Sequence, residues 1–197
     1  MPDQDAPLRS LNLAGFDEFP ILRTPRITLR EITAENADAI FAMRANHRVN
    51  QFIARPEMID LAGARDLVER TRKAYRDRQG IGWAGYLRDE NIIMGTCGFN
   101  RFEPANLRAE LGGEMAPAYW GKGLALEAVC AILRYGFETM GLHAVEARID
   151  PRNRGAKAAL AYCGFVKEAH FQRMVYFQGE FRDLAVYTVF EDTFREN

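Results

Sequence analysis

The residues best suited to chemistry form a glycine-rich turn, Tyr119-Trp-Gly-Lys-Gly-Leu-Ala-Leu-Glu-Ala128, between a predicted strand and a predicted helix. Gly121 and Gly123 have no side chains, so the backbone N–H groups beside them are left uncovered. The following helix adds positive partial charge at its N-terminus, and Lys122 adds a full charge. Such a turn is suited to cradling phosphate oxygens, so the sequence predicts a phosphate-binding loop here.

Two common phosphate-binding patterns match this turn only in part. A nucleotide-binding P-loop requires G-x-x-x-x-G-K-[ST], but here Gly123 follows Lys122 and no Ser or Thr is present to hold Mg²⁺. A dinucleotide-binding turn requires G-x-G-x-x-G, and Leu126 occupies the place of the third glycine. Glu146 lies near the spacing of a ribose-binding acidic residue, so binding of a nicotinamide cofactor stays open as an alternative.

The elements around the turn mix strands and helices. A predicted strand over about 107–115 leads into the turn, and an apolar helix over 123–140 follows it and stops at Gly141. The other predicted strands cover 27–32, 83–88, 92–99, 144–149, 165–177 and 183–191, and the other predicted helices cover 34–46, 60–78 and a segment opened by Pro151-Arg-Asn153. This order predicts one α/β (α+β) domain of about seven strands and about four helices.

The composition excludes several classes of protein. Lys and Arg total 26 and Asp and Glu total 27, which argues against a nucleic-acid partner or a polybasic membrane anchor. Hydrophobic residues make up 48%, enough for a sizeable core. The longest apolar run, 128–133, is far shorter than a membrane span of about 20 residues. The first residues lack a signal-peptide pattern, so we expect a cytoplasmic protein.

The cysteines and histidines show no pattern typical of a metal site or a disulfide framework. Cys97, Cys130 and Cys163 are widely spaced, without a C-x-x-C motif, and the three histidines lack ligand spacing. The sequence therefore predicts no metal, and each cysteine is expected to pack as a small apolar residue. Residues 1–22 are predicted to form an irregular N-terminal lead-in that packs on the domain through Phe16 and Phe19. A single domain is predicted over 23–197.

Several short motifs, in order and at matching spacing, resemble the GNAT N-acetyltransferase superfamily. They are similar above all to the branch that acetylates the N-termini of ribosomal proteins. In the family's phosphate-loop pattern Trp120 takes the first place, as is common in this branch, and Gly123 and Ala125 fill the glycine places. The matching segments are Thr24-Pro-Arg-Ile-Thr-Leu-Arg-Glu31, Ala109-Glu-Leu-Gly112, the turn 119–128, Gly141-Leu-His143, Asp150-Pro-Arg-Asn153 and 160–165.

The resemblance implies a twisted, mostly antiparallel sheet that is split by a wedge for acetyl-CoA. The wedge would lie between the strands at 109–115 and 144–149, with Gly112-Gly113 at a bulge. The loop N–H groups would bind the pyrophosphate, and the pantetheine arm would pair with strand backbone. The implied acetyl-CoA contacts are Met115, Trp120, Gly121, Lys122, Gly123, Leu124, Ala125, Asn153 and Lys157. Asn153 would offer its amide to the pantetheine, or cap the helix, or do both.

The resemblance also implies direct attack of a primary amine on the thioester, with a carboxylate as general base. Glu110 and Glu114 lie four residues apart on one predicted strand, so both side chains point to the same face. Glu110 matches the branch's Glu before Leu-Gly and is the first choice as base. Glu114 departs from the branch pattern and would be a second base or an anchor for the amine. For either, the alternative is a simple ion pair with an arginine.

The general acid of the family has no equivalent in this sequence. The place of the family's Tyr is Leu160, and the place of the branch's Ser is Ala156. Tyr162 lies nearby at a different helix angle. A thiol with a pKa near 8–9 needs little help to leave, so the loss is compatible with turnover.

The acceptor is the least constrained part of the interpretation. A protein or peptide N-terminus follows from the branch, and an aminoglycoside or polyamine is the main alternative. A sensor that binds acyl-CoA without turnover is a second alternative, since the acid positions are lost. The acceptor-binding segments are expected at 47–60, 100–107 and 174–183, and the chain is expected to be a monomer or a homodimer.

Overall fold

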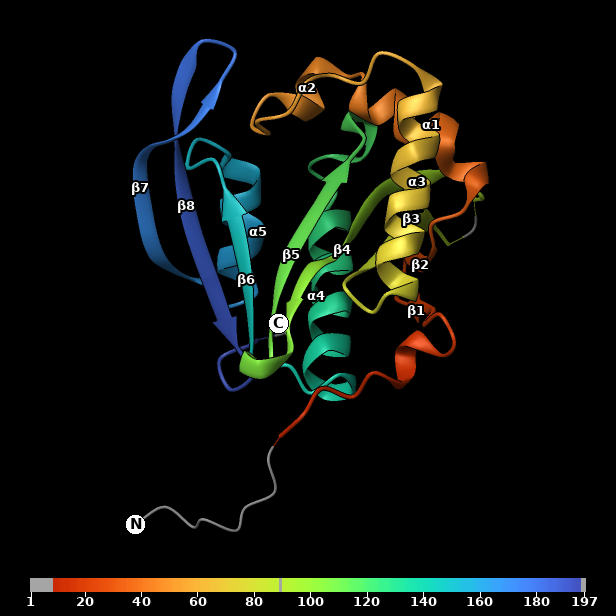
Figure 1. Ribbon diagram of the computed structural model, residues 1–197, viewed down its shortest axis with the longest axis vertical. Coiled ribbons are helices and arrows are strands. Elements are labelled where there is room, and N and C mark those ends of the chain that lie inside the picture. The colour runs from red at the N-terminus through yellow and green to blue at the C-terminus, as the bar shows by residue number, and fades with distance from the viewer. Residues whose placement is uncertain (1–8, 89, 196–197) are drawn as a thin grey trace.

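A single sheet of eight strands organises the computed structural model, which describes residues 9–88 and 90–195 (Figure 1). The strand order is β1-β2-β3-β4-β5-β6-β8-β7. The strands are β1 (Leu22–Arg23), β2 (Ile27–Glu31), β3 (Ile81–Leu87), β4 (Ile93–Glu103), β5 (Arg108–Met115), β6 (Ala144–Ile149), β7 (Val166–Phe177) and β8 (Glu180–Phe190). The mixed, mostly antiparallel sheet predicted from the sequence is confirmed.

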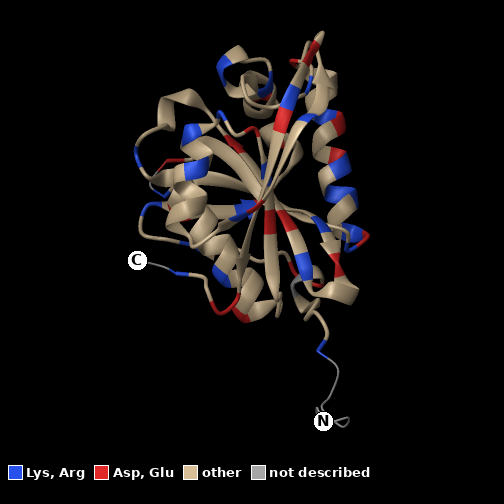
Figure 2. Ribbon diagram, turned by 90° about the vertical axis from the view of Figure 1, so that its left-hand side faces the viewer, with Lys and Arg blue, Asp and Glu red and all other residues tan. Residues whose placement is uncertain are grey.

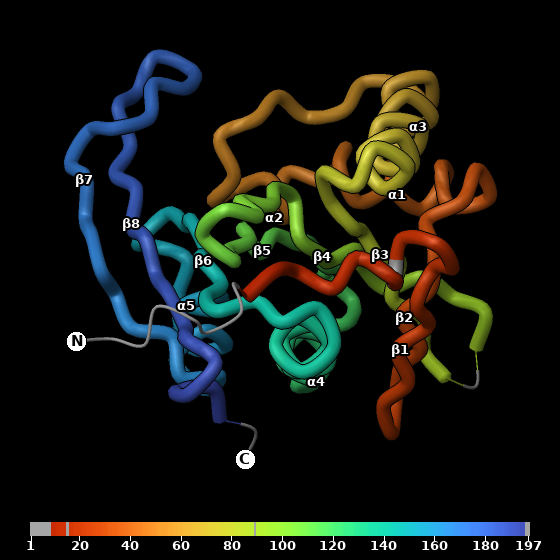
Figure 3. Tube along the Cα trace, turned by 60° about the horizontal axis from the view of Figure 1, so that its bottom comes forward, coloured from red at the N-terminus to blue at the C-terminus, as the bar shows by residue number. Residues whose placement is uncertain are grey.

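Five α-helices cover the two faces of the sheet. They are α1 (Ala37–Arg44), α2 (His47–Asn50), α3 (Leu61–Arg76), α4 (Leu124–Arg134), which continues as a π-helical turn to Thr139, and α5 (Arg154–Tyr162). Figure 3 shows α1 and α3 on one face and α4 on the other. Basic and acidic positions are interspersed in the view of Figure 2, in line with the balanced charge.

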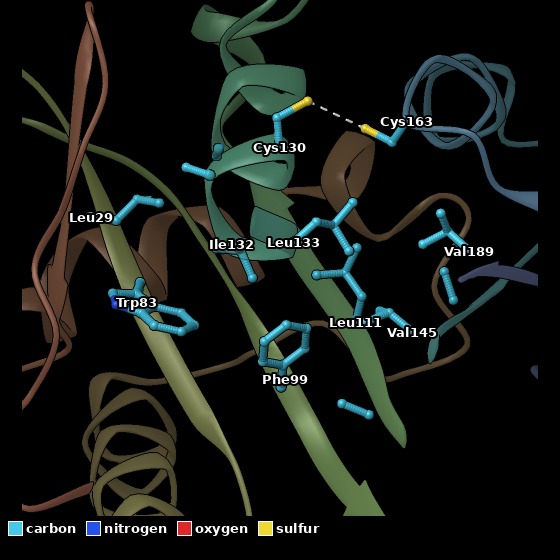
Figure 4. Close-up of a cluster of buried hydrophobic side chains, with 14 of the residues drawn as sticks. Leu29, Trp83, Phe99, Leu111, Cys130, Ile132, Leu133, Val145, Cys163 and Val189 are labelled. Atoms are coloured by element: carbon cyan, nitrogen blue, oxygen red, sulfur yellow. Dashed lines mark hydrogen bonds between the residues drawn. The ribbon is translucent and has the colours of Figure 1, made fainter. Parts of the chain in front are cut away.

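The larger hydrophobic core lies between the sheet and α4. Ile132 and Leu133 of α4 are fully buried and point toward strand residues that include Phe99 and Val145 (Figure 4). Burying each such side chain contributes about 1.5–3 kcal/mol. A smaller core, with Ile40 at its centre, packs α1 and α3 on the opposite face. On the sheet, this smaller core contacts mainly β3, through Ala84 and Tyr86.

Helix ends follow local sequence signals. Asp60 caps α3 by accepting a hydrogen bond from the Gly63 N–H at 2.8 Å. Gly141 has φ +73° and ends the helical segment after α4, as its position predicted. Two short elements, β1 and α2, were not predicted. A two-residue strand and a single helical turn are too short to produce a recognisable hydrophobic period.

The bulge lies in a different strand from the one expected. Gly112 and Gly113 pair regularly with Gly98 and Cys97, and the register shifts at Asn100 of β4 instead. A Cβ on Gly112 would lie 2.0 Å from Asn100 Nδ2, so the glycine is needed to accommodate the Asn100 side chain. The prediction of a bulge at Gly112-Gly113 is therefore wrong. Gly112 instead allows the Asn100 side chain to lie close to β5.

The N-terminal segment packs against the folded chain through aromatic rings. Phe16 and Phe19 lie 5.1 and 4.9 Å from Tyr75, measured between ring centroids, and Phe19 also contacts Trp83. The docking expected for these two phenylalanines is thus confirmed for the described residues. The division into a lead-in over 1–22 and a single domain over 23–197 stays a prediction, and residues 1–8 lie outside the described part.

Candidate active site

The predicted phosphate loop has the backbone conformation that exposes N–H groups. Gly121 and Gly123 adopt φ +73° and +74°, in the left-handed region that glycine favours. Gly123 directly precedes α4, whose N-terminal N–H groups point toward the loop. A Cβ on Gly121 would meet nothing within 4 Å, so the space in front of this turn is open. An open turn with unbonded donors suits a pyrophosphate.

Two residues of the N-terminal strand region hold this loop in place. Arg26 donates from Nη1 to the Lys122 carbonyl at 2.8 Å and from Nε to Glu127 Oε2 at 2.6 Å. The Thr24 hydroxyl donates to Glu127 Oε1. Burial opposes ionisation of Glu127, but the hydrogen bonds from Thr24 and Arg26 outweigh it and lower its pKa. Thr24 and Arg26 lay within a motif used for the resemblance, yet their role depends on long-range contacts that sequence spacing does not show.

Glu127→Gln should lower the melting temperature at pH 7 by about 4–8 °C, because it weakens a charge-assisted network of about 2 kcal/mol. The folded pKa is depressed, so the contribution is present above the usual value of 4.5 and is lost as the pH falls through the folded pKa. The gap between Glu127→Gln and wild type should therefore close in acid. Thermal melts from pH 7 to pH 3 test this, with exposed Glu35→Gln as the control. An equal gap at every pH would contradict the assignment.

The sheet opens between β5 and β6, next to the loop. These strands are parallel neighbours, and their pairing runs from Arg108 with Ala144 to Leu111 with Ala147. The pairing stops there, although β5 continues to Met115 and β6 to Ile149. The Trp120 ring nitrogen donates to the Met115 carbonyl at 2.8 Å, which ties the end of β5 to the phosphate loop. The predicted wedge is therefore present where the sequence placed it.

Across this opening, α5 begins directly after β6. The Asn153 side chain accepts a hydrogen bond from the Ala156 N–H at 3.0 Å, so it caps α5. Its amide nitrogen is a donor of the kind that a pantetheine carbonyl would accept. Lys157 lies in the first turn of the same helix. Contacts of Asn153 and Lys157 with acetyl-CoA stay predictions.

Glu110 lies at the base of the opening, on the face away from α4. It pairs in register with Glu146 of β6 and Arg101 of β4, one row before the β5–β6 pairing ends. The neighbouring Arg108 and Arg148 approach Glu146, at 3.8 and 3.6 Å, rather than Glu110. No ion pair is recorded for Glu110 within the described ranges 9–88 and 90–195. Glu110 lines a shallow depression with Glu103, Glu146, Arg101 of β4 and Arg108 of β5.

Glu114 lies on the same face but is already bound. Its side chain is only 3% exposed, Arg44 Nε donates to Oε1 at 2.6 Å, and the Arg55 guanidinium donates to Oε2. Both oxygens therefore accept from cations, which corresponds to the ion-pair alternative for this residue. The roles of Glu110 and Glu114 in catalysis stay predictions, and the geometry favours Glu110.

The two positions where the family carries a hydroxyl, Ala156 and Leu160, have apolar side chains that cannot donate a proton. Ala156 lies in the first turn of α5, and Leu160 is 5% exposed and part of the core. Cys163 is fully buried, so it is inaccessible to a thioester. Burial raises the pKa of the Cys97 thiol to about 12. An acyl-cysteine intermediate therefore has no support at these positions.

The described part of the chain contains neither a candidate membrane-spanning helix nor a candidate metal-binding cluster. No helix there is long and apolar enough to cross a membrane. No group of three or more His, Cys, Asp or Glu side chains there is arranged to hold a metal ion.

Comparison with known proteins identifies the family. Residues 26–166 match the model of the acetyltransferase (GNAT) domain. The chain is 33% identical to the uncharacterized N-acetyltransferase YoaA of Bacillus subtilis, over 87% of this chain and 97% of that protein. It is 32% identical to the [ribosomal protein uS5]-alanine N-acetyltransferase of Escherichia coli, over 48% of this chain and 50% of that enzyme.

Solved structures agree with the sequence matches. The ribosomal L7/L12 α-N-protein acetyltransferase RimL, in complex with coenzyme A, aligns with a TM-score of 0.80 at 17% identity, over 88% of this chain and 99% of that one. The alignment shows the shared fold, and the ribosomal-protein branch indicated by the motifs is represented among the relatives. With its open glycine turn and divided sheet, this chain belongs to the GNAT acetyltransferase family and is an acetyl-CoA-dependent N-acetyltransferase.

Proposed function

We propose that the enzyme acetylates the N-terminal amine of a protein or peptide by direct attack on acetyl-CoA. The observation that carries this proposal is the place of Glu110, a carboxylate without a recorded arginine partner at the base of the β5–β6 opening. An incoming amine there would approach a thioester lying in the opening. The match to a uS5-alanine N-acetyltransferase supports a polypeptide acceptor.

The proposed reaction forms one bond and breaks one. The neutral amine nitrogen attacks the thioester carbonyl carbon, and the C–S bond breaks as the tetrahedral intermediate collapses. Before the attack, Glu110 removes the proton that keeps the bound amine cationic, directly or through water, and the nitrogen loses its second proton to solvent as the amide forms. CoA leaves as a thiolate and takes a proton from solvent, which its ordinary thiol pKa permits without a positioned acid. This route accounts for Ala156 and Leu160 at the places where relatives of the family carry a hydroxyl.

Residues 47–60, which we propose contact the acceptor, lie beside β5 and the phosphate loop. Residues 47–60 contact β5 through the ion pair between Arg55 and Glu114. They also contact the phosphate loop, because the Arg48 guanidinium lies 5.1 Å from the centroid of the Trp120 ring. Figure 3 shows α2 close to β5. This arrangement supports an acceptor path between α2 and the sheet.

Purified enzyme should release CoA from acetyl-CoA in the presence of short peptides with free N-termini, and mass spectrometry should place the acetyl group on the α-amine. The controls are the same peptides with blocked N-termini and a panel of polyamines and aminoglycosides. Release only with small amines would contradict the polypeptide proposal. Binding of acetyl-CoA without any release would favour a sensor, and thermal stabilisation by NAD alone would favour the dinucleotide alternative. Ligand at 100 times its Kd stabilises by about 2.7 kcal/mol, so these shifts are measurable.

A further inference from the structure

A buried carboxylate, that of Glu114, lies between two guanidinium groups, four residues along β5 from the proposed base Glu110. Glu114 accepts from Arg44 and Arg55, whose side chains are 24% and 20% exposed. Arg55 also donates from Nε to Asn50 Oδ1 at 2.8 Å. The three charged groups therefore carry one net positive charge, and both cations retain some contact with the surface.

Arg44 and Arg55 each have N–H groups that Glu114 does not use. Each guanidinium has five N–H groups, and Glu114 takes only the Nε of Arg44 and the Nη2 of Arg55. Within residues 9–88 and 90–195, Nη1 and Nη2 of Arg44 and Nη1 of Arg55 have no hydrogen-bond partner. Burial, followed by the charge of Arg44, lowers the pKa of Arg55 despite its ion pair with Glu114. An additional anion would relieve this unbalanced positive charge.

The site faces the same side of the sheet as Glu110. Glu110 and Glu114 share one face of β5, separated by about 13 Å at 3.3 Å per residue. Gly112 lies between them without a side chain, and the Asn100 side chain lies over it. A ligand lying along this face would meet a carboxylate at one end and two guanidinium groups at the other.

We propose that Arg44 and Arg55 form an anion subsite for the acceptor, so that preferred acceptors are polypeptide N-termini with Asp or Glu at the fourth or fifth residue. An extended peptide advances about 3.3 Å per residue, so an acidic side chain at these positions would reach the arginines when the amine is at Glu110. Paired guanidinium donors are suited to carboxylate recognition. A polycationic amine would be repelled by the same pair. This assignment rests on the proposed peptide acetylation.

The test compares peptides that differ by one isosteric group, such as Ala-Ala-Ala-Asp and Ala-Ala-Ala-Asn at the start of an otherwise identical sequence. Wild-type enzyme should prefer the Asp peptide in kcat/KM by about tenfold or more. Arg55→Gln should remove this preference, so that the ratio of kcat/KM for the Asp and Asn peptides falls to near one. Arg65→Gln, which changes the net charge equally at an exposed site on α3, should keep the preference.

Folding and acetyl-CoA binding are checked by circular dichroism and thermal shift for each variant, and Arg44→Gln serves as a second test should Arg55→Gln fail to fold. Equal rates for the two peptides with wild-type enzyme would overturn the subsite and leave peptide acetylation intact. A folded Arg55→Gln variant whose kcat/KM falls equally with both peptides would also overturn the subsite, since the arginine would then only support the structure. Turnover of a polyamine but of no peptide would overturn the proposed function and the subsite together.

Discussion

Glu110→Gln should lower kcat for acetyl transfer by about 10²–10⁴-fold at pH 7, the range typical of losing a general base, while acetyl-CoA affinity stays nearly unchanged. The amide is isosteric with the carboxylate but cannot accept a proton. Glu110 is on the face opposite α4, whereas the proposed contacts with the pyrophosphate come from Gly121 to Ala125, so cofactor affinity is not expected to depend on Glu110. Steady-state kinetics with a peptide acceptor, beside a direct acetyl-CoA titration, measure both quantities.

The chain provides a matched control for this experiment. Glu146 pairs with Glu110 across β5 and β6, but Arg108 and Arg148 approach it. Glu146→Gln removes an equal charge from the same depression and should retain most of the activity. A comparable loss from both variants would mean that the depression contributes charge rather than a specific base.

The pH dependence separates a base from a structural role. A peptide α-amine has a pKa near 7.7–8.0, so the fraction that is already neutral rises steeply toward pH 9. The deficit of Glu110→Gln should therefore shrink as the pH rises, because less of the amine needs a proton acceptor. A deficit that is constant from pH 6.5 to 9 would remove Glu110 from the role of base.

Local signals in the sequence account for most of the fold and for the loop. The two glycines before an apolar helix predicted a turn with uncovered backbone N–H groups, and the positive φ angles of Gly121 and Gly123 are compatible with such a turn. Strand β6 has the predicted bounds, since its apolar residues lie between clear turn signals. The common face of Glu110 and Glu114 followed from the alternation of side chains along a strand. Each of these inferences depends on neighbouring residues only.

The missed features depend on contacts between distant parts of the chain. Arg26 reaches Glu127 across about a hundred residues of sequence, and Arg44 and Arg55 converge on Glu114 from α1 and the segment after α2. Nothing in residue spacing distinguishes these arginines from the many exposed ones. The bulge was placed on the wrong strand for a related reason. A glycine pair signals close approach, and only the partner strand shows that Asn100 is the residue that approaches.

Gly123→Asp should weaken CoA binding by on the order of 100-fold, because it adds a negative charge where the pyrophosphate would meet the backbone. Gly123 also has φ +74°, so part of any effect would come from backbone strain. Gly123→Asn separates the two causes. Asn and Asp tolerate this conformation similarly, and Asn carries no charge. Isothermal titration with CoA should place Gly123→Asn between wild type and Gly123→Asp.

The same variants tested with acetyl-pantetheine isolate the phosphate contribution further. This shortened donor keeps the thioester and the amides that would pair with strand backbone at the β5–β6 opening, but it lacks the pyrophosphate. Its kcat/KM should therefore change little between wild type and Gly123→Asp, although both should use it poorly. If Gly123→Asp impaired both donors equally, the variant would be disturbing α4 or the sheet opening. If it impaired neither, the pyrophosphate would lie away from the Gly121–Gly123 turn, and Arg26 would be holding the loop for another purpose.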